Sequence, residues 1–89
     1  MKNVVQVERI LKALANRRRI AIVYYLSKNP GAKVGNIAAE IKLSFKSTSR
    51  HLSVLLSANI VEREQVSLEM HYTLVNPPHQ ILKNLLSIL

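Results

Sequence analysis

The residues best suited to chemistry lie in one short stretch, LSFKSTSRHLSVL, which covers residues 43–55. At about 100° per residue in a helix, one arc collects two cations and three short hydroxyls: Lys46, Ser49, Arg50, Ser53 and Ser57. Serine is a poor helix former, so five serines in residues 44–57 are an unusual way to build a merely solvated face. Short hydroxyls let a helix lie deep in the major groove, where Lys and Arg reach phosphates and guanine. The stretch therefore favours a DNA-contacting helix over a solvated one.

The charge of the chain is unevenly placed. The net charge is +8, and residues 1–61 carry eleven lysines and arginines against two glutamates. Residues 62–89 carry two basic residues against three glutamates. A basic chain of this kind favours a polyanionic partner. A membrane surface is the weaker alternative, because no helix pairs a lysine-rich face with aromatics at its boundary.

The residue types that the chain lacks exclude several activities. There is no cysteine, which removes disulfides, thiolate chemistry and the usual structural zinc sites. There is no aspartate, the five glutamates are scattered, and two glycines cannot form a Gly-rich phosphate loop. We therefore predict no enzymatic activity and no cofactor. Because Glu8 and Arg9 interrupt the apolar pattern of the start, we expect neither a signal peptide nor a membrane span, and hence a cytoplasmic protein.

Apolar periodicity predicts four helices, over residues 3–15, 17–28, 34–42 and 45–58. Asn16 and Ser44 are the expected N-caps of the second and fourth helices. The second helix is apolar almost all round, so we expect it to be the central and most buried element. Phe45 falls on the apolar arc of the fourth helix, which predicts that it packs in the core or at the turn.

The pattern then changes period. IVEREQ and EMHYTLV are rich in strand formers and flank Val66-Ser67-Leu68, which predicts a hairpin. Asn76-Pro77-Pro78 ends the second strand and opens a last helix over residues 78–89. The expected fold is mostly α with a small β-hairpin, a winged helix-turn-helix with four helices, two strands and a fifth helix. Residues 1–89 are expected to form one such domain.

Residues 10–74 resemble the ArsR-type transcriptional repressors without a gap. ILKALANRRRIAIVYYL is similar to the opening helices of that family, including Arg19 before an apolar helix. LSFKSTSRHLSVLLSANIVERE is similar to its recognition helix and first wing strand, and Tyr72 stands where the second wing strand usually has a tyrosine. The resemblance implies a DNA-binding winged helix in which Arg19 is structural.

Nine residues are predicted to contact double-stranded DNA: Ser44, Lys46, Ser47, Ser49, Arg50, Ser53, Arg17, Arg18 and Arg63. The three arginines at 17–19 lie in the first turn of a helix, where cations oppose the helix dipole at a cost of about 0.3–1 kcal/mol each. DNA phosphates or carboxylates elsewhere in the protein are expected to offset that cost, and for Arg17 and Arg18 phosphate contact and plain solubility are equally open.

The expected wing departs from the family pattern. The family often has Gly and Arg at the tip, whereas this chain has Gln65, Val66, Ser67 and Leu68 between glutamates. Acidic side chains repel phosphate, to an extent that salt reduces. The wing is therefore expected to stand off the duplex or to contact only its backbone through Arg63.

The resemblance also raises metal sensing, which the residues oppose. The thiols that flank the third helix in the family correspond to Lys33 and Gly35 here. The other metal site of the family needs His and carboxylate ligands on the last helix, which offers only His79. A lone His is more often a satisfied or exposed side chain than a ligand. We expect no metal site, and we expect His51 and His71 to pack or form hydrogen bonds.

The last helix carries apolar side chains over an arc of about 160°, too wide for one chain to cover. A homodimer formed by helices 3–15 and 78–89 is favoured over a monomeric core, and family members dimerise through these elements. The expected interface residues are Val4, Val7, Leu11, Ile81, Leu82, Leu85 and Leu89.

Together these features predict a dimeric, sequence-specific DNA-binding repressor without a metal site. The alternative is a winged-helix adaptor module that docks a protein partner through its apolar C-terminal helix.

Overall fold

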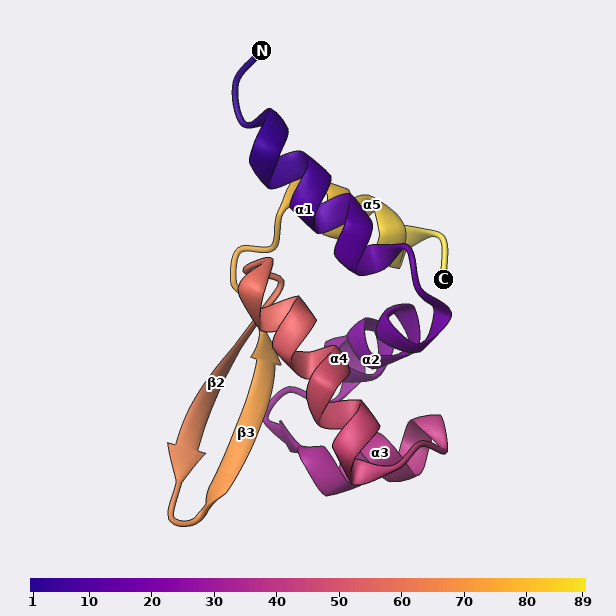
Figure 1. Ribbon diagram of the computed structural model, residues 1–89, viewed down its shortest axis with the longest axis vertical. Helices are drawn as coiled ribbons and strands as arrows, with labels where there is room; N and C mark the ends of the chain where they lie inside the picture. The colour runs from indigo at the N-terminus through magenta and orange to yellow at the C-terminus, as the bar shows by residue number, and fades with distance from the viewer.

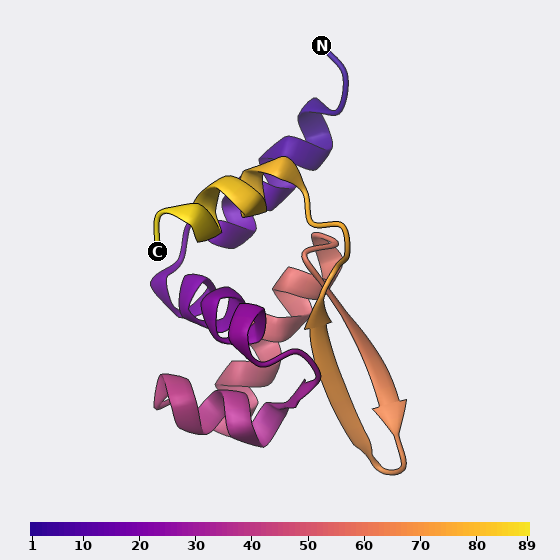
Figure 2. The same cartoon turned by 180° about the vertical axis from the view of Figure 1, so that it is seen from behind.

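The computed structural model describes residues 1–89 and has the winged helix-turn-helix fold (Figure 1). Its elements follow the order α1 (Val4–Leu14), α2 (Arg17–Lys28), β1 (Ala32–Lys33), α3 (Val34–Ile41), α4 (Phe45–Ser57), β2 (Val61–Val66), β3 (Glu69–Leu74) and α5 (Gln80–Ser87). Helices α1 and α5 lie at one end of the molecule, and α3 and the hairpin tip lie at the other (Figures 1 and 2). The predicted fold class is confirmed.

Side-chain caps set the starts of the helices. Asn16 Oδ1 accepts hydrogen bonds from the backbone N–H groups of Arg18 and Arg19 at 2.9 and 3.1 Å, and Ser44 Oγ accepts one from Ser47 at 3.1 Å. Both predicted caps are confirmed. The last helix begins at Gln80, two residues later than predicted, because His79 is the N-cap and its Nδ1 accepts from the N–H of Ile81 at 3.1 Å.

The sheet has three strands in the order β1-β3-β2, all antiparallel. The two-residue strand β1 was not predicted, because two residues show no periodicity. It pairs Ala32 with Tyr72 and Lys33 with His71. The His71 ring Nδ1–H donates to the carbonyl of Gly31 at 2.9 Å, so this histidine forms a hydrogen bond as expected.

One core joins the helices to the sheet. Its fully buried members include Ile22 and Leu26 of α2, Ile37 of α3, and Leu52 and Leu55 of α4. Helix α2 is central, as predicted, with contacts to four other helices or strands. It is less buried than predicted, because one flank faces solvent and Tyr24 is 43% exposed.

Arg19 connects the end of α1 to α4. Its guanidinium donates to the carbonyls of Ala13 and Lys12, which belong to the last turn of α1 and lack partners within the helix. Its Nη1 lies 3.2 Å from Nδ1 of His51 in α4. Burial, and then the positive charges of Arg19 and Arg18, lower the pKa of His51, which keeps the ring neutral and able to accept this bond. The structural role of Arg19 and the hydrogen-bonding role of His51 are confirmed.

The neighbouring Arg18 behaves similarly, since its Nη1 donates to the carbonyl of Ile41, the last residue of α3, at 3.2 Å. Two of the three arginines in the first turn of α2 therefore meet the negative ends of other helices, which offsets their unfavourable position on the α2 dipole.

We expect Arg19→Met to lower the free energy of unfolding by about 1.5–3 kcal/mol, because it removes hydrogen bonds from a charged donor to carbonyls of α1. Urea denaturation followed by circular dichroism measures this difference. Arg17→Met is the matched control, because Arg17 is exposed and forms no hydrogen bond or ion pair through its side chain. Equal losses for the two variants would contradict the role of Arg19.

Candidate nucleic-acid interface

The fourth helix divides into a buried face and an exposed polar face. Thr48, Leu52 and Leu55 are buried in the core. On the other side Lys46, Arg50 and Ser53 are exposed, and Ser49 is half-buried. Neither Lys46 nor Arg50 forms an ion pair, because the two ion pairs of the protein are Lys12–Glu8 and Lys33–Glu69. The polar arc thus presents two cations that no protein carboxylate neutralises.

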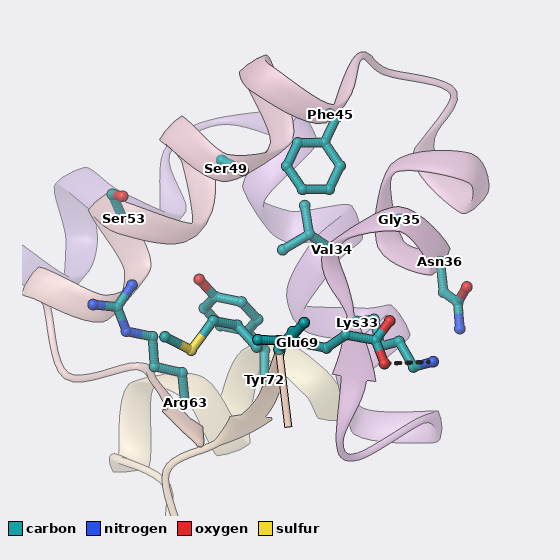
Figure 3. Close-up of a pocket in the computed structure, with 12 residues that line it drawn as sticks. Lys33, Val34, Gly35, Asn36, Phe45, Ser49, Ser53, Arg63, Glu69 and Tyr72 are labelled. Atoms are coloured by element: carbon teal, nitrogen blue, oxygen red, sulfur yellow. Dashed lines mark ion pairs between the residues drawn. The ribbon is translucent and has the colours of Figure 1, made fainter. Parts of the chain in front are cut away.

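A groove runs between α4 and the wing, with a volume of about 650 Å³. Ser49 and Ser53 line it from α4, and Arg63 faces them from β2 (Figure 3). Lys33 of β1 and Asn36 of α3 line the same groove and were not among the predicted site residues. The approach of α3 to the wing comes from the pairing of β1 with β3, so no local pattern could have indicated it.

The alternation of side chains along the wing strands separates its charges. Arg63 pairs with the buried Tyr72 and shares the face of Val61, which is also buried. Glu62 and Glu64 therefore lie on the opposite face of the hairpin.

The third glutamate of the wing, Glu69, is partly neutralised by an ion pair, because its Oε1 lies 3.2 Å from Nζ of Lys33. The groove side of the wing consequently carries Arg63 without the two acidic residues that flank it in sequence.

Phe45 differs from its prediction. It is 63% exposed and lines the groove beside Ser49, whereas it had been expected to pack in the core or at the turn (Figure 3). On the helical wheel it lies between the buried arc and the polar arc, and it is the first residue of α4. The sequence signal was therefore ambiguous.

The remaining predicted DNA contacts have different surroundings. Arg17 is exposed and free, whereas Arg18 is held by the carbonyl of Ile41. The hydroxyl of Ser44 is used as the cap of α4, and Ser47 is half-buried in the first turn. The structure brings Arg63, Ser49 and Ser53 together around the groove, and the other six predicted contacts, Lys46 and Arg50 among them, lie outside its lining.

The predicted interface residues mostly lie on the surface of α1 and α5. Val4, Leu11 and Leu89 are each more than half exposed, and Val7, Ile81 and Leu85 are half-buried. Leu82 is 1% exposed and belongs to the core of the chain, so it is not a surface residue. Its side chain packs inward because α5 closes the core at that end.

The structure offers little to a metal ion. No three His or Glu side chains gather in a suitable group. At the positions where the resemblance would require thiols, Lys33 is paired with Glu69 and Gly35 has no side chain. His79 uses its Nδ1 to cap α5. These donors do not fit the metal sites of the family. No helix is long and apolar enough to cross a membrane.

Comparisons with known proteins agree with this geometry. The family model described as "Bacterial regulatory protein, arsR family" matches residues 16–63. The HTH-type transcriptional regulator YgaV of Escherichia coli (strain K12) is 27% identical over 71 residues, which cover 80% of this chain and 72% of that protein.

Two solved structures are similar over nearly the whole chain. HlyU from Vibrio cholerae N16961 has a TM-score of 0.81 at 29% identity, and the match covers 98% of this chain and 90% of the HlyU chain. The homodimeric winged helix-turn-helix DNA-binding domain Mb0332 from Mycobacterium bovis has a TM-score of 0.81 at 27% identity. This match covers 96% of this chain and 75% of the Mb0332 chain. Since the family model matches more than half of the residues and the fold agrees, the chain belongs to the arsR family of bacterial regulatory proteins and is a winged-helix, DNA-binding transcription regulator.

Proposed function

We propose that the protein is a dimeric repressor that binds a specific duplex with α4 in the major groove and does not sense metal. The observation that carries this proposal is the exposed face of α4, where short hydroxyls surround two unpaired cations. The family assignment favours this function over the protein-docking adaptor that the sequence had left open.

The side chains of α4 suit different contacts. Arg50, in the second turn, has a planar head group that can donate two hydrogen bonds to guanine, so we assign it to base recognition. Lys46, in the first turn, is a point charge suited to phosphate. Ser49 and Ser53 mainly permit close approach of the helix to the groove floor. Arg63 lies across the groove, and we assign it to a contact with the phosphate backbone of the DNA.

Charges outside the groove add to binding without reading sequence. Arg17 lies in the first turn of α2, exposed and unpartnered. Arg18 keeps further donors beyond the one used on Ile41, and both residues are assigned to phosphate. The outward position of Glu62 and Glu64 supports a backbone contact by Arg63, because it reduces the repulsion that the sequence had indicated.

The surface of α1 and α5 supports a second copy as partner. Leu11 and Leu89 are each 52% exposed, and a shallow apolar depression is lined by Val4, Val7, Leu11 and Ala15. Leaving such side chains in water is unfavourable, so burial against a two-fold partner stabilises the assembly. The similar domain from Mycobacterium bovis is described as homodimeric. Two α4 helices would then enter successive grooves about 34 Å apart on an inverted repeat.

In this proposal, occupancy of the DNA site by the dimer is enough to repress transcription. A dimer that covers two successive grooves prevents RNA polymerase from using the same duplex. No contact with the polymerase is needed for this effect.

We expect Arg50→Ala and Lys46→Ala to differ, although each removes one positive charge. On a duplex selected by the protein from a random library, Arg50→Ala should cost about 1–3 kcal/mol and have little effect on random duplex. Lys46→Ala should weaken both duplexes alike and reduce the salt slope by about one unit. Fluorescence anisotropy at several salt concentrations measures both effects.

The matched control is Lys83→Ala, which removes an exposed charge from α5 and should leave the specificity ratio unchanged. If Arg50→Ala weakens selected and random duplexes equally, α4 is an electrostatic surface and does not read sequence. If neither α4 variant has an effect, the polar arc is a solvated face.

We expect Leu11→Glu to convert the dimer to a folded monomer, because Leu11 is exposed on each chain and a buried charge at the interface is unfavourable. Sedimentation at micromolar concentration measures the assembly, and circular dichroism checks the fold. Leu68→Glu makes the same change at the wing, where Leu68 is 94% exposed, and should leave the dimer intact. An unmutated protein that sediments as a monomer would rule out the dimer.

We expect zinc, copper and arsenite to bind weakly and to leave DNA affinity unchanged, since the donors at the family positions are unsuitable. Titration calorimetry and anisotropy in the presence of each ion measure this. A sub-micromolar site that disappears in His79→Ala would show that α5 does hold a metal.

A further inference from the structure

Phe45 is the large apolar side chain that α4 exposes most, with 63% of its surface in solvent. It is the first residue of the helix and belongs to the turn capped by Ser44. The ring is not part of the hydrophobic core, and it is the only phenylalanine side chain of the protein. Because this exposed ring lines the groove at the start of α4, it is available for contact with a partner outside the chain.

The position of Phe45 relates it to the polar face. Phe45, Ser49 and Ser53 are spaced by four residues, so they lie in one row along α4, and all three line the groove. Figure 3 shows the ring at the end of this row, next to Val34 and at the mouth of the groove. Residues near the N-terminus of a recognition helix are placed to contact base edges, and Phe45 begins α4. The free cations Lys46 and Arg50 follow on the adjoining side of the helix.

The chemistry of the major groove offers one apolar group, the 5-methyl group of thymine. Serines on the same row are too short to reach it with apolar surface, whereas a phenylalanine ring can cover it. We propose that Phe45 is a specificity-determining residue that contacts a thymine methyl group and selects a T–A pair in each half-site. This inference rests on the proposed insertion of α4 into the major groove.

Deoxyuridine in place of thymine provides a sharp test, because it removes the methyl group and preserves every hydrogen bond of the base pair. Each thymine of a duplex selected by the unmutated protein is replaced in turn, and affinity is measured by anisotropy. At one position in each half-site we expect a loss of about fourfold, the value for one buried methyl group. The other replacements should have little effect.

The second arm identifies the side chain. In Phe45→Ala the loss at that position should disappear, because the ring that covered the methyl group is gone. In Arg50→Ala the loss should persist, although overall affinity is lower. Leu68→Ala is the matched apolar control on the wing and should also retain the loss, since Leu68 lines the same groove and is 94% exposed.

Several outcomes would overturn the proposal. If every thymine replacement is silent while binding remains specific and salt-dependent, Phe45 reads no methyl group and only this inference fails. If Leu68→Ala abolishes the loss, the wing makes the contact. If no duplex is bound in a salt-dependent manner, the proposed function itself fails. If Phe45→Ala does not fold, the thymine series on the unmutated protein still tests for a methyl contact, and Leu68→Ala still tests whether the wing makes it.

Discussion

The hydrogen bonds of one guanidinium group connect the end of α1 to α4. Arg19 binds the last carbonyls of α1 and the neutral ring of His51 in α4, and so joins the two helices directly. Protonation of His51 is disfavoured by burial and by the nearby arginines, and this lowered pKa preserves the bond. Because α1 carries the surface proposed for pairing and α4 carries the polar arc, both halves of the proposed function meet at this residue.

Much of the fold could be predicted because its signals are local. Helical periodicity located four helices, and Asn16 and Ser44 located two of their starts. The strand β1 could not be predicted, since its two residues are defined only by pairing with a segment forty positions away. The start of α5 was misjudged because a histidine cap is a weaker signal than two prolines. Helix α2 was expected to be the most buried element, but Tyr24 is 43% exposed, since an apolar sequence does not show which flank remains uncovered.

The candidate site shows the same division. The polar arc of α4 follows from spacing alone, and the structure exposes it. The groove does not follow from spacing, because its other wall comes from the wing and from the start of α3. Counting glutamates suggested an acidic wing, but strand alternation places Glu62 and Glu64 away from Arg63. Phe45 lies on the border between two arcs, where the sequence pattern is compatible with burial and exposure alike. Long-range packing therefore decided the shape of the groove and the exposure of Phe45.

The scarcity of ion pairs has a consequence for the lifetime of the protein. Only two of the thirteen lysines and arginines form ion pairs. The positive charges of the folded chain therefore repel one another when no partner is bound. A duplex supplies the missing negative charge, and any ligand that binds only the folded state raises the free energy of unfolding. Molecules bound to DNA are therefore unfolded less often, and presented to proteases less often, than free ones. Occupancy of a duplex is therefore expected to lengthen the life of each copy of the regulator.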